Sequence, residues 1–364
     1  MSSPEPLRLA APRFGDDALD ALAEVLAGGR LTQGPKVAAF EEAIASYCGV
    51  PHAVATTSAS TALHVVLAAL DLGPGDEVVV PDFTYPATGN AVLQTGASLR
   101  LVDVDPRTYN VDPDRLAHAL TERTKAVIAV DLFGLPADYT ALDVGDVPLV
   151  CDAACALGAE WDGRRCGAIG AAACFSFHPR KVLTTGEGGM VTTADDALAA
   201  RLRRLVNHGS ERDGWRSTFV EPGFNYRLSE LQAALGLVQV PHHDAVVERR
   251  RELAARLSDL LADVDGIELP FEPPYARHCW QAYVCVVDED VDRDALIAAL
   301  RERGVESTLG TYALHAEPAY AGSGEFPVSL SLARRTLALP LHEKLADDDP
   351  QRVADAIGDC LRRL

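Results

Sequence analysis

The sequence predicts an α/β fold, in which helices cover both faces of a mostly parallel central sheet and a smaller α+β domain follows. The segments 126–130 and 147–151 are continuous apolar runs with the length of strands, which is typical of strands buried on both faces. Such runs alternate along the chain with segments of helical spacing, and this alternation favours a parallel sheet. The chain has 364 residues, which suits two domains better than one.

The chain opens with two predicted helices, over 16–27 and 36–48, because the apolar residues of both recur with helical spacing. Gly28 and Gly29 end the first helix. The polar, glycine-bearing loop at 30–35 is either a linker or a flap over a site.

Polar residues follow the next two predicted strands. The strand at 53–56 leads into the small and hydroxyl residues 57–61, which open a helix over 62–70. A helix start of this kind offers backbone N–H groups and a positive end to an anion, although an ordinary helix cap is the alternative. The strand at 77–81 precedes a polar and aromatic turn, in which Tyr85 either packs or stacks on a flat ring.

Asp152 directly follows the apolar run at 147–151. A buried carboxylate without a partner is costly, so the position needs a cationic or donating partner. A protonated pyridine nitrogen would fit. Ligands of parallel sheets bind beyond the carboxyl ends of the strands, where Asp152 is expected to lie.

Lys181 lies in a turn that follows the short apolar run at 174–177 and precedes the glycine-rich segment 186–189. Lysine is normally a solvated surface residue. A desolvated lysine has a lowered pKa and forms imines with carbonyl compounds. We therefore predict that Lys181 carries pyridoxal phosphate (PLP), with a surface lysine beside a glycine turn as the alternative. One strand-like segment separates Lys181 from Asp152, so both can face one crevice.

A domain boundary is predicted at Pro241, which separates a large domain over 1–240 from a small α+β domain over 241–364. The second part begins with a long, charged amphipathic helix over 242–264, and a strand follows at 282–287.

The composition excludes several classes of partner. A formal net charge of -20 argues against a surface for nucleic acids or anionic membranes. The eight cysteines form no C-x-x-C pair, so we expect reduced thiols in a cytoplasmic protein and no metal site. We see no signal-peptide pattern, and no apolar run approaches the roughly 20 residues that span a bilayer.

Five motifs that occur in order carry a resemblance to a known family: Thr57-Ser58-Ala59-Ser60, Pro81-Asp82-Phe83-Thr84-Tyr85, Asp152-Ala153-Ala154, Ser176-Phe177-His178-Pro179-Arg180-Lys181 with Gly186-Glu187-Gly188-Gly189, and Gly223-Phe224-Asn225-Tyr226-Arg227. Together they resemble the DegT/StrS sugar aminotransferases. These are fold-type-I PLP enzymes that act on nucleotide-linked keto-sugars. The resemblance covers nearly the whole chain, so it implies a fold-type-I PLP transferase whose domain over 1–240 binds the cofactor.

The resemblance implies a role for each matching residue. Lys181 would hold PLP as an imine and move a proton between the substrate's α carbon and the C4′ carbon of the cofactor. Asp152 would pair with the pyridinium nitrogen and keep the ring an electron sink. The backbone of Ala59 and Ser60, with the hydroxyls of Ser60 and Ser176, would hold the phosphate.

The remaining roles concern the ring, the partner subunit and the substrate. Tyr85 would stack on the ring. Asn225 would reach the phosphate from the partner subunit, which implies a homodimer with shared active sites. Candidates for contact with the sugar or diphosphate are Arg30, Arg180, Tyr312 and His315.

Two departures from the family pattern concern the cofactor site. Many members have glutamine where this chain has Cys155, near the PLP hydroxyl group, and a thiol is a weak hydrogen-bond donor. Ala59 replaces a frequent glycine. Lysine is present at 181, which argues against the related dehydratases that use histidine there.

The resulting hypothesis is a PLP-dependent aminotransferase that moves the amino group of L-glutamate onto a nucleotide-linked 4-keto-6-deoxyhexose. One alternative keeps the chemistry and replaces the substrate by a keto-cyclitol of the inosose type. A second alternative is a non-catalytic regulator on the same fold, and the intact Lys181 and Asp152 argue against it.

Overall fold

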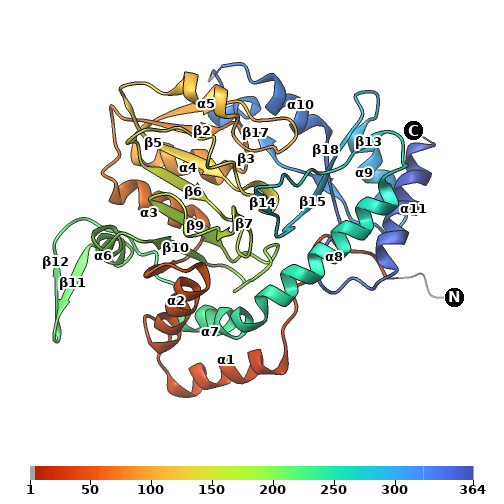
Figure 1. Ribbon diagram of the computed structural model, residues 1–364. Coiled ribbons are helices and arrows are strands. Elements are labelled where there is room, and N and C mark those ends of the chain that lie inside the picture. Colours follow the sequence, from red (N-terminus) through yellow and green to blue (C-terminus); the bar gives the residue numbers. More distant parts are fainter. Residues whose placement is uncertain (1–4, 323, 364) are drawn as a thin grey trace.

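The computed structural model describes residues 5–322 and 324–363. Its centre is a seven-stranded sheet in the order β1-β10-β9-β6-β5-β2-β4 (Figure 1). The strands are β1 (His52–Thr56), β2 (Glu77–Pro81), β4 (Ser98–Val102), β5 (Thr124–Val130), β6 (Leu149–Asp152), β9 (Ala172–Ser176) and β10 (Gly189–Thr193). Strand β10 runs antiparallel to both of its neighbours, and the other neighbouring pairs are parallel. The predicted mostly parallel sheet is therefore confirmed.

Helices cover both faces of this sheet, because successive side chains of each strand point to opposite faces. In β2, Val78 and Val80 pack on one face and Val79 on the other. The first face carries α3 (Ala59–Ala69), α4 (Pro86–Thr95) and α6 (Asp196–Leu205). The second carries α2 (Pro35–Cys48), α5 (Pro113–Ala119) and α7 (Glu230–Gln239), and α1 (Asp16–Gly28) lies against α7.

The C-terminal part of the chain builds a second, antiparallel sheet in the order β13-β15-β18-β16. Its strands are β13 (Ile267–Glu268), β15 (Tyr283–Val287), β16 (Thr308–Leu309) and β18 (Thr336–Leu339). One face shares a core with α8 (His243–Leu261), α9 (Arg293–Glu302) and α11 (Asp349–Leu361), and the other packs against α10 (Pro327–Arg335). Helix α8 is the long helix that runs from the central sheet to this second sheet (Figure 1).

Two short strand pairings and one isolated bridge cross position 241. Strand β14 (Ala276–Arg277) pairs with β7 (Glu160–Trp161), which in turn pairs with β8 (Arg164–Arg165), and β17 (Tyr312–Ala313) pairs with β3 (Phe83–Thr84). Leu7, near the start of the chain, bridges to Val305. The two parts are thus tied together by backbone hydrogen bonds, and the division at 240/241 stays a prediction.

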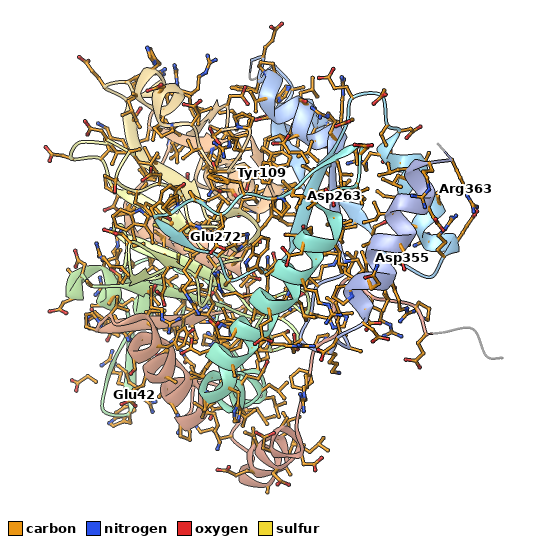
Figure 2. All side chains as sticks on the ribbon, turned by 45° about the vertical axis from the view of Figure 1, so that its right-hand side comes forward. Glu42, Tyr109, Asp263, Glu272, Asp355 and Arg363 are labelled. Carbon is orange, nitrogen blue, oxygen red and sulfur yellow. The ribbon has the colours of Figure 1, made fainter. Side chains whose placement is uncertain are left out.

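The surface has two features that bear on partners. A hairpin of β11 (Ser210–Asp213) and β12 (Arg216–Phe219) projects from the body, and Trp215 at its turn is 91% exposed (Figure 1). Acidic side chains such as Glu42 on α2 and Asp355 on α11 are exposed (Figure 2). Among the described residues, no helix has the length and apolar composition that crossing a bilayer requires.

Candidate active site

The helix start after β1 leaves two backbone N–H groups free. Ser58 is the N-cap of α3, its Oγ accepts the N–H of Thr61, and Thr61 Oγ1 accepts the N–H of Ser58. Ala59 and Ser60 belong to the first turn, where no intrahelical acceptor exists, and no described residue accepts their N–H groups. Ser60 is exposed. The α3 start therefore fits a phosphate group, as a helix N-terminus does.

Gly189 forms the wall beside this helix start. It pairs with Thr56 in β1 on one side and with Ser176 in β9 on the other. A Cβ atom at Gly189 would lie 2.4 Å from the carbonyl carbon and oxygen of Ser58, which are backbone atoms that cannot move aside. The close approach brings Ser176 to the same end of the sheet as α3, as the predicted phosphate site requires.

Asp152 ends β6 and is 5% exposed. Its Oδ2 accepts the hydroxyl hydrogen of Thr88 at 2.7 Å, and its Oδ1 accepts the N–H of Ala154 at 3.2 Å. Burial raises the pKa of Asp152, while these two hydrogen bonds and the charge of Lys181 act in the opposite direction. An ionised carboxylate has about four acceptor positions, so Asp152 retains capacity for a cationic N–H donor.

Lys181 is half-buried in the turn after β9, and its Nζ donates to Cys155 Sγ at 3.0 Å. Cys155 lies in the loop that follows β6, three residues after Asp152. Neighbouring parallel strands β6 and β9 thus bring Lys181, Cys155 and Asp152 to one edge of the sheet. The contact shows that Cys155 lies at the lysine, whereas the resemblance implied only a position near the PLP hydroxyl group.

Tyr85 and Tyr312 lie next to each other because β3 pairs with β17. Their ring centroids are 6.4 Å apart and the ring planes are at 61°. Tyr85 is 64% exposed, which leaves its face free to stack on a flat ligand.

His315 is held by a buried carboxylate to which the sequence analysis gave no role. Asp82 is fully buried at the end of β2, and its Oδ2 lies 2.6 Å from His315 Nδ1. Its Oδ1 accepts the N–H of His315 at 2.8 Å. Burial raises the pKa of Asp82, and the hydrogen bonds from His315 oppose that rise. Because Nδ1 of His315 is bound to Asp82, its Nε2 is the imidazole nitrogen that is available to a ligand.

The loop that carries Arg30 is pinned to α7. The carboxylate of Glu230 is buried and accepts the N–H groups of Gly34, Lys36 and Val37 at 2.8, 3.0 and 2.9 Å. These donors form the start of α2, whose first N–H groups lack intrahelical partners. The Arg30 guanidinium is exposed and donates to the carbonyl of Gln33. No hydrogen bond among the described residues links Arg30 to Lys181.

Asn225 and Arg180 have exposed side chains without a hydrogen-bond partner among the described residues. The backbone of Asn225 bridges to Asn207, beside the projecting hairpin. Arg180 directly precedes Lys181. Both side chains are therefore available to a ligand or a second subunit, but the fold of one chain does not bring Asn225 into contact with Lys181.

A cavity of about 450 Å³ adjoins the lysine turn. Its walls include residues 10–15, Lys181, Arg250 and His342, but not Asp152, Cys155 or Ser60. Lys181 Nζ is bonded to Cys155, which does not line this cavity, so we do not place the cofactor in it.

Sequence reasoning gave no role to three residues that shape this site: Thr88, Asp82 and Glu230. The hydroxyls of Thr84 and Thr88 are 3.1 Å apart, and the four-residue spacing of these threonines after a strand end was a usable signal. Glu230 follows the capping Ser229 and looks like an ordinary acidic residue of a first helical turn.

Comparison with known proteins agrees with this geometry. A model of the DegT/DnrJ/EryC1/StrS aminotransferase family matches residues 12–358. The chain belongs to this family. GDP-perosamine synthase of Caulobacter vibrioides is 37% identical over 99% of this chain and 100% of its own length.

Solved structures give the same result. The aminotransferase TlmJ from Streptoalloteichus hindustanus superimposes with a TM-score of 0.93 at 35% identity, covering 98% of this chain and 99% of its own. The PLP form of Spr1654 from Streptococcus pneumoniae has a TM-score of 0.93 at 27% identity, covering 98% of this chain and 99% of its own. The DegT-family chain is therefore a PLP-dependent sugar aminotransferase with the fold predicted above.

Proposed function

We propose that this enzyme transfers the amino group of L-glutamate to a nucleotide-linked keto-sugar, of which a 4-keto-6-deoxyhexose is the expected class. The observation that carries the proposal is the convergence of Lys181, Cys155 and Asp152 at one sheet edge. The GDP-linked product named for the Caulobacter vibrioides relative supports a nucleotide-linked substrate.

The residues present fit PLP. The free N–H groups of Ala59 and Ser60 would hold its phosphate, together with the hydroxyls of Ser60 and Ser176. Asp152 would keep a proton on the ring nitrogen, and its buried carboxylate has the free acceptor capacity for that bond. When bound, PLP supplies an electron sink for chemistry at the substrate's α carbon.

Lys181 is the group that acts on both the cofactor and the substrate. Its Nζ would bind the cofactor's aldehyde carbon, and once released it would move a proton at the α carbon of the substrate. Cys155 Sγ, 3.0 Å from Nζ, would orient the amine between these two tasks. Tyr85 would stack on the ring through its exposed face.

The substrate and the second subunit would complete the site from its open side. Asn225, exposed beside the projecting hairpin, would reach the phosphate held by the partner, so that a homodimer is the active unit. Arg30, Arg180, Tyr312 and His315 would contact the sugar or its diphosphate. The two arginines would then supply cations on a chain whose net charge is -20. A cytoplasmic location remains our expectation.

Borohydride reduction followed by peptide mapping tests the proposal. The chain has only four lysines (Lys36, Lys125, Lys181 and Lys344), so the assignment is simple. We expect the pyridoxyl label on Lys181, and we expect Lys181→Ala to lose both label and transamination. Lys125→Ala is the matched control, because Lys125 is exposed on β5 and bonds only the carbonyl of Glu122. A label that persists in Lys181→Ala would rule the mechanism out.

A panel of keto-sugar nucleotides with L-glutamate tests the substrate. We expect release of 2-oxoglutarate only with a nucleotide-linked substrate. A keto-cyclitol enzyme would ignore the nucleoside diphosphate, and a non-catalytic regulator would release no 2-oxoglutarate with any member of the panel.

A further inference from the structure

The turn at 278–281 has a strained backbone and lies next to the lysine turn. Trp280 has φ of 51°, in the left-handed region that non-glycine residues rarely adopt. Its ring stacks on the imidazole of His278 with centroids 4.2 Å apart, and its backbone N–H donates to His278 Nδ1 at 2.8 Å. Strain of this kind persists only where the surroundings hold it, and it is concentrated at functional sites.

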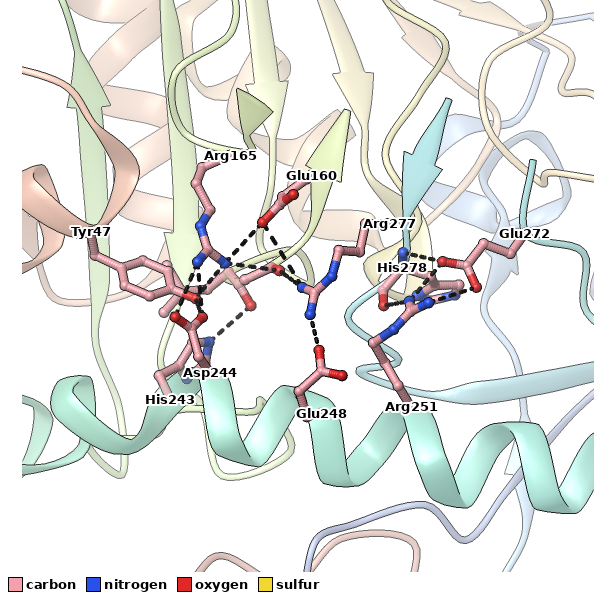
Figure 3. Close-up of polar contacts among 12 residues, drawn as sticks. Tyr47, Glu160, Arg165, His243, Asp244, Glu248, Arg251, Glu272, Arg277 and His278 are labelled. Carbon is pink, nitrogen blue, oxygen red and sulfur yellow. Dashed lines mark hydrogen bonds and ion pairs between the residues drawn. The ribbon is translucent and has the colours of Figure 1, made fainter. Parts of the chain in front are cut away.

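Two consecutive arginines of α8 hold this turn. Arg250 is 4% exposed, and its guanidinium donates to the carbonyls of Trp280 and Gln281 at 2.9 and 2.8 Å and to Glu343. Arg251 donates to the carbonyl of His278 at 2.7 Å and pairs with Glu272 (Figure 3). One helix therefore fixes the backbone of the turn at three positions, 278, 280 and 281.

Helix α8 is itself bound to the part of the chain that contains the central sheet. Asp244 pairs with Arg165 at 3.0 Å and accepts the hydroxyl hydrogen of Tyr47 at 2.6 Å (Figure 3). One turn further on, Glu248 pairs with Arg277 (Figure 3). Arg277 belongs to β14, which pairs with β7 in the part of the chain that carries Lys181, so the turn is held against that part.

Two side chains of this turn donate hydrogen bonds to backbone carbonyl groups of the site. Gln281 Nε2 donates to the carbonyl oxygen of Arg180 at 2.9 Å. Cys279 Sγ donates to the carbonyl oxygen of Cys155 at 3.2 Å. The two contacts flank the 3.0 Å contact between Lys181 Nζ and Cys155 Sγ, one on each of the two segments that make it.

We propose that Gln281 is a positioning residue for Lys181: its side-chain amide, on a backbone that Arg250 holds, fixes the peptide group between Arg180 and Lys181 and thereby the direction of the lysine side chain. The inference rests on the proposed role of Lys181. Gln281 is half-buried, so water can replace its amide as a donor to the Arg180 carbonyl. Its loss should therefore leave folding nearly unchanged and affect the alignment of Lys181 Nζ.

The test compares Gln281→Met, which keeps the length and loses the donor, with Gln281→Glu, which also adds a negative charge. Gln351→Met is the matched control. Gln351 lies on α11, and its Nε2 donates to Asp355 Oδ1 at the same 2.9 Å. Each variant is loaded with PLP and measured by thermal unfolding, by the pH titration of the bound cofactor's absorbance, and by its single-turnover rate with L-glutamate.

For Gln281→Met we expect a rate about tenfold below that of Gln351→Met, with half-saturation by glutamate changed less than about twofold, because misalignment acts on the reacting step. For Gln281→Glu we expect a titration midpoint raised by roughly half a unit or more, since a nearby negative charge favours the protonated form. Unfolding midpoints should match the control.

The inference is overturned if both Gln281 variants match Gln351→Met in rate and in titration midpoint. It is equally overturned if the rate falls only in proportion to lost folded protein. The titration needs no amino donor, so it remains informative if glutamate is not the donor. Failure of the proposed function appears separately, as wild-type enzyme in which borohydride does not label Lys181.

Discussion

Thr88 on α4 donates its hydroxyl hydrogen to Oδ2 of Asp152 at 2.7 Å, although 64 positions of sequence separate the two residues. The bond supports an ionised carboxylate in a buried position, where desolvation raises the pKa of Asp152. It also orients the carboxylate, together with the N–H of Ala154, which donates to Oδ1 at 3.2 Å. Thr88 therefore acts on Asp152, which would contact the cofactor, although Thr88 itself would not.

Thr88→Val should raise the pKa of Asp152 further and reduce transamination about tenfold, because one charge-assisted hydrogen bond to the carboxylate is lost. The measurement is the pH dependence of kcat, whose limb for Asp152 should move to higher pH. Thr95→Val is the control, since Thr95 lies on the same helix and bonds only Val92 and Ala97 backbone groups. An unchanged pH profile in Thr88→Val would contradict the assignment.

Gly189→Ala should weaken PLP binding at least about tenfold, because the new methyl group meets the Ser58 carbonyl and must displace the α3 start. Equilibrium dialysis of PLP with the apoenzyme measures this effect. Gly28→Ala serves as the control, since a Cβ atom at Gly28 in α1 meets nothing within 4 Å. Equal PLP affinity in the two variants would show that α3 does not hold the phosphate.

Glu230→Gln should destabilise the fold by about 1–3 kcal/mol, because one amide oxygen cannot accept all three N–H groups that the buried carboxylate now satisfies. Urea unfolding measures the change. Glu24→Gln is the control, because Glu24 is exposed and its carboxylate pairs with the Lys36 ammonium group and not with a backbone N–H group. A loss in Glu230→Gln no larger than in Glu24→Gln would mean that the α2 start does not depend on this carboxylate.

The pH dependence of stability should report on Asp131, at the end of β5. Burial raises the pKa of Asp131 from 3.8 to about 7. The folded state therefore holds more protons than the unfolded state between these values, so this group's favourable contribution is complete below pH 3.8 and is lost as the pH rises toward 7. Asp131→Asn should lack that loss. Urea unfolding should show that the stability of Asp131→Asn rises relative to that of wild type as the pH rises across this range. A difference in stability that does not change with pH would contradict the prediction.

Several features of the site could be predicted from single segments. Asp152 follows an apolar run, Lys181 follows another, and Ser58 opens a helix, so each could be recognised from local pattern and motif. The roles of Thr88, Asp82 and Gln281 could not be recognised in this way. Each looks like an ordinary residue in its own segment, and its role depends on a segment far away in the sequence.

The sequence by itself determined the layered α/β architecture, because strand length, helical spacing and apolar runs are local properties that decide which faces are buried. It also led to the proposal that Lys181 and Asp152 carry the chemistry, since a lysine on a glycine-flanked turn and an acid at a strand end are visible in the chain. Only the tertiary structure decided that Cys155 meets Lys181 and that Gln281 reaches the Arg180 carbonyl. Those contacts depend on the order of the strands and on the position of α8. A change of less than 1 Å in the donor–acceptor distance makes or breaks a hydrogen bond.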